Sequence, residues 1–180
     1  PMLLDATAKG VYVIAPTPFL PDGRVDDAST DRMTEFFLEA GCDGMTILGV
    51  MGEAPKLDGA ESLEISRRII RRAGKAGVIV GVTAPGFAAM RALARGVMDA
   101  GAAAVMIAPP SHLRTDDGIV TYYRQAVEAI GDDIPFVLQD YPQLFQVQMT
   151  PGVIRRIAMD LPSCVMLKHE DYPGLEKISA

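Results

Sequence analysis

The sequence contains few of the residues from which metal centres and disulfide frameworks are built. Its 180 residues include two histidines, His112 and His169, and two cysteines, Cys42 and Cys164. Metal-dependent sites usually gather several imidazoles around one ion, so we expect no metal, and no other cofactor is indicated. Two cysteines do not make a disulfide framework, which predicts a reducing, cytoplasmic setting. We interpret both as small apolar side chains rather than nucleophiles.

Long apolar runs and an excess of positive charge are also absent. No stretch of 18 apolar residues occurs, and the N-terminal PMLLDATAKG has no basic region followed by a long apolar one. The sequence therefore predicts neither a membrane span nor a secretory signal. A net charge of −6 argues against nucleic acid or an anionic membrane as the main partner. With 49% apolar and 22% charged residues, the chain is typical of one globular domain.

Six short runs that are apolar almost throughout recur along the chain. Their starts are separated by 33, 34, 26, 31 and 29 residues. Such runs are typical of strands buried on both faces, and the stretches between them have helical spacing of apolar residues. The pattern predicts parallel βα units. The predicted strands are residues 11–15, 44–48, 78–82, 104–108, 135–139 and 164–168.

Two parallel architectures fit this repeat, an open doubly wound sheet and a closed barrel. An open sheet usually carries a Gly-rich phosphate-binding turn after its first strand, whereas this chain has Pro-Thr-Pro-Phe at 16–19. Neither GxGxxG nor GxxxxGK[ST] occurs anywhere in the chain. We therefore predict the α/β class and a TIM (β/α)8 barrel, in which the chemistry follows the C-terminal ends of the strands.

Lys168 is the strand-end residue best suited to covalent chemistry. It follows the apolar run 164–167, so its amine is expected to emerge from a dry strand into the barrel mouth. Desolvation disfavours the ammonium form, and the neutral amine is the form that attacks a carbonyl carbon. Tyr141 follows the neighbouring strand, where its hydroxyl is a candidate proton shuttle. A lysine that simply extends to water is the alternative that these residues alone leave open.

Four features occur in a fixed order: residues 10–19 (GVYVIAPTPF), the turn Gly-x-x-Gly-Glu at 49–53, Tyr141 and Lys168. In these features the chain resembles the dihydrodipicolinate synthase and N-acetylneuraminate lyase family of Schiff-base aldolases, over essentially its whole length. The resemblance implies a homo-oligomeric barrel, tetramer or dimer, that joins or splits 2-oxo acids. It also implies that Lys168 forms a Schiff base with pyruvate or a related acid, and that Tyr141 relays protons.

The turn after the second predicted strand departs from the family pattern. Val50 and Met51 stand where the family usually has two threonines, and neither side chain donates a hydrogen bond. The resemblance implies that Gly49, Val50, Met51 and Gly52 bind the substrate carboxylate, partly through main-chain N–H groups that need no particular side chain.

Two further departures concern specificity. Pro110 and Ser111 stand in place of the synthases' tyrosine pair, so Ser111 and His112 are possible supporting residues. Between Tyr141 and Thr150 the chain has no arginine, whereas the synthases place one there for a second substrate. We therefore expect a synthase-like lyase or aldolase that makes or breaks a carbon–carbon bond. Two alternatives stay open: a true 4-hydroxy-tetrahydrodipicolinate synthase of lysine biosynthesis, and a non-catalytic member that binds an oxo acid.

Other charged residues are interpreted as structural. Strand alternation should turn His169 away from the side of Lys168, and Asp140 and Glu170 are interpreted as partnered carboxylates. The cluster of basic residues at 67–75 is interpreted as a solvated helix face, in which Glu64 stands four residues before Arg68 and can pair with it.

The predicted strands do not complete a barrel. A closed barrel has eight strands and about 250 residues, whereas 180 residues at this repeat length hold six. We therefore expect residues 1–180 to form an incomplete (β/α)8 barrel, with strands one to six and the start of helix six in residues 174–180. Strands one and six are then open edges, and we expect a truncated chain that does not form an active enzyme alone.

Overall fold

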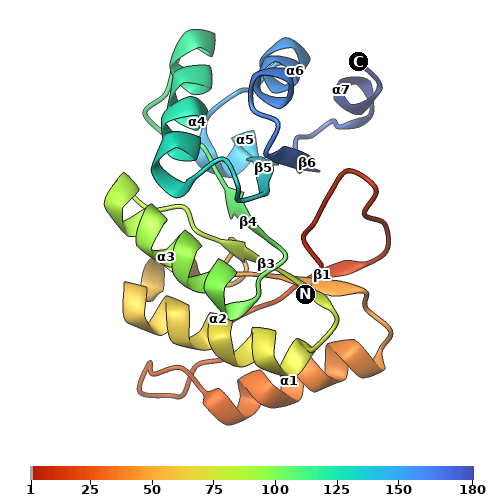
Figure 1. Cartoon of the computed structure of the whole chain (residues 1–180), viewed down its shortest axis with the longest axis vertical. Helices are drawn as coiled ribbons and strands as arrows, with labels where there is room; N and C mark the ends of the chain where they lie inside the picture. Colours follow the sequence, from red (N-terminus) through yellow and green to blue (C-terminus); the bar gives the residue numbers. More distant parts are fainter. Residues whose placement is uncertain (1) are drawn as a thin grey trace.

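The computed structural model describes residues 2–180 and contains one parallel sheet whose strands follow chain order (Figure 1). Each strand pairs in parallel with the next along the sequence, so the sheet has six strands. The strands are β1 (Tyr12–Ile14), β2 (Gly44–Ile47), β3 (Gly77–Gly81), β4 (Ala104–Ile107), β5 (Phe136–Asp140) and β6 (Cys164–His169). They confirm the six predicted strands to within one residue at each end.

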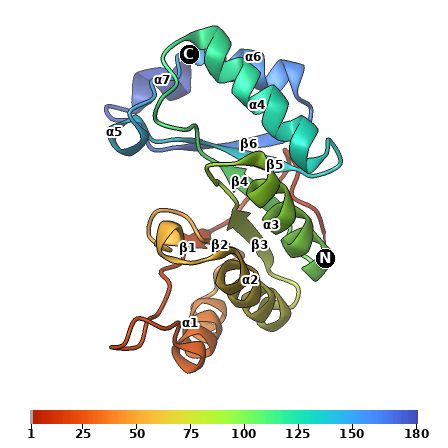
Figure 2. The same ribbon diagram turned by 90° about the vertical axis from the view of Figure 1, so that its left-hand side faces the viewer.

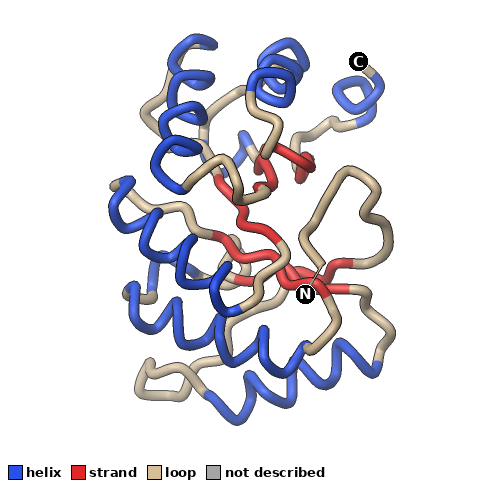
Figure 3. The backbone as a smooth tube through the Cα atoms, in the orientation of Figure 1, coloured by secondary structure: helices blue, strands red, loops and turns tan. Residues whose placement is uncertain are grey.

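Helices alternate with the strands and lie outside the sheet (Figure 3). Viewed from the side, α1 to α4 and α6 follow the curve of the strands, which is the arrangement of a partial TIM barrel (Figure 2). The helices are α1 (Asp27–Glu39), α2 (Gly59–Ala73), α3 (Phe87–Ala100), α4 (Asp116–Ile130), α5 (Pro142–Phe145), α6 (Pro151–Asp160) and α7 (Leu175–Ser179), with a short 3-10 turn η1 (Ala54–Lys56). None of the helices in residues 2–180 is both long and apolar enough to cross a membrane.

Capping side chains fix where the longer helices begin. Asp58 and Glu61 form a capping box at the start of α2, each side chain accepting from the other's backbone N–H. Thr150 caps α6 and Pro151 occupies its first turn, as the sequence predicts. These local signals determine where α2 and α6 begin.

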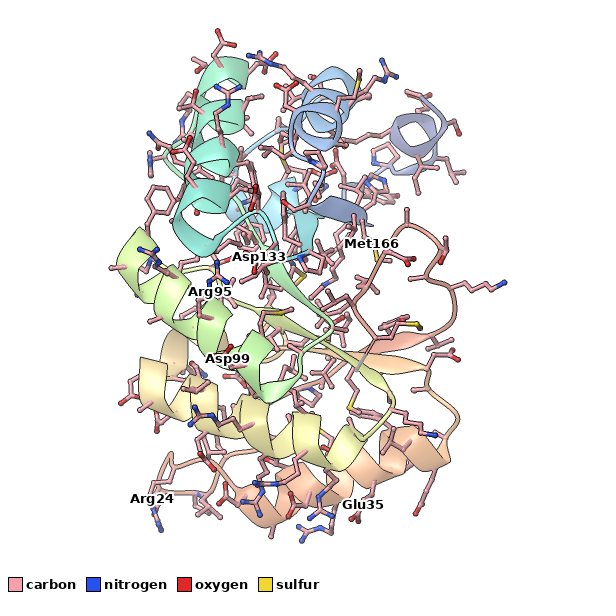
Figure 4. All side chains as sticks on the ribbon, in the orientation of Figure 1. Arg24, Glu35, Arg95, Asp99, Asp133 and Met166 are labelled. Atoms are coloured by element: carbon pink, nitrogen blue, oxygen red, sulfur yellow. The ribbon has the colours of Figure 1, made fainter. Side chains whose placement is uncertain are left out.

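The two faces of the sheet pack into separate apolar clusters. Phe136 and Leu138 of β5 belong to the large cluster that the helices cover, whereas Val137 belongs to a smaller inner cluster. The inner cluster includes Leu4, whose backbone N–H donates to the carbonyl of Ala103 at 2.9 Å. Since side chains alternate along a strand, the inner face is the one that becomes a barrel interior. Figure 4 shows the side chains on this framework.

β1 and β6 lie at the two ends of the strand order, and each has a single neighbour within the described sheet. Their outer edges are therefore open, as the strand count predicts. The strand order and the alternating helices confirm the α/β barrel class. They do so for six of the eight strands that a closed barrel requires.

The basic face of α2 is paired differently from the prediction. Arg68 donates from Nε and Nη2 to both carboxylate oxygens of Asp31 on α1, at 2.7 and 2.8 Å. Arg72 contacts Asp31 at 3.0 Å and also pairs with Glu35, which Figure 4 labels. No hydrogen bond or ion pair joins Arg68 to Glu64 within residues 2–180. The arginines thus connect α1 and α2 rather than pairing with residues of their own helix. A bidentate contact across the groove between the helices satisfies more donors than a pair along one helix.

Candidate active site

Lys168 lies near the C-terminal end of β6 and projects from the inner face of the sheet. In the β5–β6 ladder it pairs with Gln139, two residues beyond Val137 of the inner cluster. Its side chain is 20% exposed, and its Nζ lies 3.2 Å from Oε1 of Glu170. The amine is thus largely enclosed and in contact with one carboxylate.

Glu170 is held beside Lys168 by two hydrogen bonds. Its backbone N–H donates to the carbonyl of Asp140 at 2.8 Å, which continues the β5–β6 ladder past the end of β6. Its Oε1 accepts from Nε2 of Gln139 at 2.9 Å, and its side chain is 27% exposed. Because positions 168 and 170 lie on the same side of an extended chain, the carboxylate faces the same space as the amine.

Tyr141, the predicted proton relay, lies just beyond the C-terminal end of β5. It is the first residue after β5, caps α5, and packs its ring edge-on against Phe145 at 6.2 Å between centroids. Within residues 2–180 no hydrogen bond or ion pair joins Tyr141 to Lys168. The residue that the ladder sets opposite Lys168 is Gln139, which the sequence reasoning did not single out.

His169 points to the other side of β6, as strand alternation predicts. Its Nδ1 lies 3.2 Å from Oδ2 of Asp140, and its Nε2 lies 3.1 Å from the carbonyl oxygen of Gly174. The same Asp140 oxygen receives Nζ of Lys177, on α7, at 2.8 Å. Asp140 is fully buried, so this network is a structural one that holds α7 against β5 and β6. The interpretation of Asp140 as a partnered carboxylate agrees with these contacts.

Asp171 completes the attachment of α7. Burial acts to raise the pKa of its carboxyl, but hydrogen bonds from Lys177 and Gln143 outweigh burial and leave that pKa below its usual range. The Lys177 contact is 3.0 Å long and the Gln143 contact 3.0 Å. The carboxylate is therefore ionised at neutral pH and anchors both side chains.

The turn 49–53 lies after β2 at the same end of the sheet. The buried Thr17 hydroxyl, from the loop after β1, donates to the carbonyl of Gly52 at 2.6 Å. Glu53 adopts a left-handed backbone with φ of 54° and pairs with Lys56. Within residues 2–180 the backbone N–H groups of 49–52 donate no hydrogen bond, so they are free to receive an anion. Val50 and Met51 are 37% and 57% exposed.

Close packing against β3 and β4 fixes the position of this turn. A Cβ at Gly81 would lie 2.2 Å from the carbonyl oxygen of Leu48, so only glycine allows the backbones to approach this closely. Met106, on the inner face of β4, places its Cε 3.3 Å from where a Cβ of Gly49 would stand. The turn therefore borders the inner face on which Lys168 lies.

The loop after β4 carries the two predicted supporting residues. Ser111 and His112 are both exposed. His112 lines a cavity of about 430 Å³ together with Phe87, Leu113 and Tyr122. No hydrogen bond or ion pair joins Ser111 or His112 to Lys168 in the part of the chain that the structure describes. The supporting role of Ser111 and His112 stays a prediction, which mutation of each residue would test.

Cysteine and metal chemistry receive no support from the geometry. Burial raises the pKa of the Cys164 thiol to about 11, so the thiol is protonated and weakly reactive at neutral pH. Across residues 2–180 no group of three or more His, Cys, Asp and Glu side chains is arranged to hold a metal ion. The arrangement places an amine beside a carboxylate, at the same end of the sheet as a turn whose backbone N–H groups at 49–52 donate no hydrogen bond within residues 2–180.

Comparison with known proteins agrees with this chemistry. A sequence model described as the "Dihydrodipicolinate synthetase family" matches residues 7–171. A relative from Methylococcus capsulatus, called 4-hydroxy-tetrahydrodipicolinate synthase, is 32% identical over 95% of this chain and 58% of its own length. The chain thus spans somewhat more than half the length of the curated relatives that it matches.

Solved structures give the same result for the fold. A dihydrodipicolinate synthase from Rhodopseudomonas palustris superposes with a TM-score of 0.97 at 64% identity, over 99% of this chain and 60% of that chain. A chloride-inhibited dihydrodipicolinate synthase from Acinetobacter baumannii, solved with pyruvate, has a TM-score of 0.83 at 29% identity over 90% of this chain and 55% of that chain.

Proposed function

Because this chain belongs to the dihydrodipicolinate synthetase family, we propose that it supplies the Schiff-base lysine of a pyruvate-type lyase or aldolase. The observation that carries the proposal is the placement of Lys168 on the inner face at the C-terminal end of β6, enclosed and within 3.2 Å of Glu170. Active sites of TIM barrels lie at this end of the strands. The relative solved with pyruvate supports a small 2-oxo acid as the substrate.

The proposed reaction begins with attack of the neutral Lys168 amine on the keto carbon of the 2-oxo acid. Loss of water from the adduct gives an iminium ion, which withdraws electrons from the neighbouring carbon. That carbon can then lose a proton to form an enamine and attack an aldehyde, or the reverse sequence can break a carbon–carbon bond. The unpartnered N–H groups of the turn 49–52 are proposed to hold the substrate carboxylate.

Two departures favour a second candidate, a member that binds an oxo acid without turning it over. Val50 and Met51 offer the turn no hydroxyl, and Pro110 and Ser111 stand where the synthases carry a tyrosine pair. Synthesis of 4-hydroxy-tetrahydrodipicolinate itself is the third candidate, supported by the names of the relatives. We further propose a homo-oligomer, dimer or tetramer, in the cytoplasm, for which the two free cysteines are compatible evidence.

Trapping with borohydride separates these candidates. The intact full-length protein is incubated with pyruvate and a small panel of 2-oxo acids, reduced, and digested, and the mass of the peptide that contains Lys168 is measured. We expect the mass of a reduced pyruvate adduct on Lys168, and none in Lys168→Arg. If pyruvate stabilises the folded protein but no adduct forms, the protein is a member that binds an oxo acid without turning it over. Condensation measured with aspartate semialdehyde identifies a true synthase.

A further inference from the structure

Glu170 is an acid–base group in direct contact with the amine of Lys168. Its Oε1 lies 3.2 Å from Nζ of Lys168, and the contact joins side chains that are 27% and 20% exposed. Tyr141, which the family resemblance puts in the proton-relay role, has no hydrogen bond or ion pair with Lys168 in residues 2–180. The lysine therefore has a carboxylate, and not a phenol, in position to exchange a proton with it.

Gln139 orients that carboxylate. It is 3% exposed, pairs with Lys168 across the ladder, and donates its Nε2 to Oε1 of Glu170 at 2.9 Å. Because a buried amide needs a hydrogen-bond partner and this one donates to Glu170, the bond holds the carboxylate beside the amine. The ladder bond from Glu170 N–H to Asp140 fixes its backbone as well.

We propose that Glu170 is the general acid–base of Schiff-base formation, with Gln139 as its positioning residue. This rests on the proposed function of Lys168. First, the Glu170 carboxylate takes a proton from the Lys168 ammonium. The free amine then adds to the keto carbon, and the C=O electron pair moves to oxygen, which collects a proton from the nitrogen. Finally, the Glu170 carboxylic acid gives its proton to that hydroxyl, which leaves as water with the C–O electron pair.

The steps return Glu170 to its carboxylate form and convert ammonium and ketone into iminium and water. No oxidant, metal or second protein acid is needed. The iminium then faces the same carboxylate, which can accept the proton of the adjacent carbon as the enamine forms. A positioned general acid–base contributes about 10²–10⁴-fold to the rate of such a step.

The test measures the rate of adduct formation in Glu170→Gln. Glutamine keeps the shape and the contact with Gln139 but cannot take up a proton. We expect adduct formation with pyruvate at neutral pH to slow by about 10²-fold or more, and exchange of the methyl protons of pyruvate in D2O to slow likewise. If Glu170 only neutralised the Lys168 ammonium, Glu170→Gln would instead speed adduct formation. Removal of the carboxylate would then favour the nucleophilic free amine.

Two further variants keep the test independent of folding. In Glu170→Ala, added formate should restore the trapping rate in a saturable manner, since a small carboxylate can enter the vacated space. Glu176→Gln, the same change at an exposed position of α7, is the matched control, and circular dichroism and urea midpoints monitor the fold.

A Glu170→Gln rate within threefold of the unaltered protein, or no response of Glu170→Ala to formate, overturns the proposal. If the unaltered protein itself gives no adduct, the proposed function fails and this inference fails with it. An adduct in the unaltered protein with an unchanged Glu170→Gln rate refutes only the role of Glu170.

Discussion

The residue that lies opposite Lys168 is determined by a one-residue shift in the register between β5 and β6. Phe136 pairs with Cys164, an offset of 28, but Val137 pairs with Met166, an offset of 29. The extra residue in β6 forms a bulge, which bends the strand and redirects the residues that follow. Lys168 therefore faces Gln139, whereas an uninterrupted ladder would set it opposite Asp140.

At this scale the roles of Tyr141 and Glu170 can be compared directly. We expect Tyr141→Phe to slow adduct formation by less than about tenfold and Glu170→Gln by about 10²-fold or more, because within residues 2–180 the amine is paired with Glu170 and not with Tyr141. The measurement is the initial rate of borohydride-trapped adduct at saturating pyruvate. A larger loss of rate in Tyr141→Phe than in Glu170→Gln would show that Tyr141, and not Glu170, is the proton relay.

Among the elements, α1 and α2 are joined by ion pairs whose strength depends on pH. Hydrogen bonds from Arg68, with the charges of Arg68 and Arg72, hold the pKa of Asp31 below its usual value of 3.8. Because the pKa of Asp31 is lower in the folded chain than in the unfolded chain, its carboxylate contributes stability above about pH 4. This contribution is lost as the pH falls through the lower, folded-state pKa.

The Asp31→Asn variant tests this contribution. We expect it to unfold at a lower urea concentration than the unaltered protein at pH 7, with the difference shrinking as the pH falls below about 4. Urea midpoints measured from pH 7 to 3 give the result. A difference that is constant over this range would mean that Asp31 stabilises by packing or helix propensity and not by its charge.

The turn 49–53 depends on a glycine in a neighbouring strand. In Gly81→Ala a methyl group would meet the carbonyl oxygen of Leu48 at 2.2 Å, so the turn or the strand must move. Overpacking of this kind costs about 1–3 kcal/mol. We also expect weaker pyruvate binding, since the turn carries the proposed carboxylate site.

Gly49→Ala is the matched variant for this position. Its added methyl group would meet only the flexible Cε of Met106, at 3.3 Å, so we expect a smaller loss of stability than in Gly81→Ala. Urea unfolding and the pyruvate concentration for half-maximal trapping measure both effects. Equal losses in the two variants would show that the approach of Gly81 to Leu48 does not fix the turn.

For the whole molecule, the two open strand edges set the solution behaviour of these 180 residues. β1 and β6 each have one neighbour in the described sheet, and parallel strands normally have both faces and both edges covered. We expect the isolated chain to bind the dye ANS and to associate as its concentration rises. Size-exclusion chromatography with light scattering checks this, and a monomer that binds no dye and melts cooperatively would contradict it.

The sequence by itself determined the six strands, their order and the face of Lys168. Each strand is a short apolar run bounded by turn residues, and alternation along a strand puts residues 166, 168 and 170 on one face without knowledge of the neighbours. Local caps such as Asp58 and Thr150 similarly determined where helices begin, because they act within one turn of the chain.

Only the tertiary structure decided which side chains meet. The sequence predicts a structural role for the Glu170 carboxylate and a pair between Arg68 and Glu64 on one helix. In the structure, Glu170 contacts Lys168 and Arg68 contacts Asp31. These contacts depend on a bulge between β5 and β6 and on the distance between two helices, which no local pattern encodes. A shift of one residue in the β5–β6 register changes the neighbour of Lys168 from Gln139 to Asp140, while the apolar pattern stays the same.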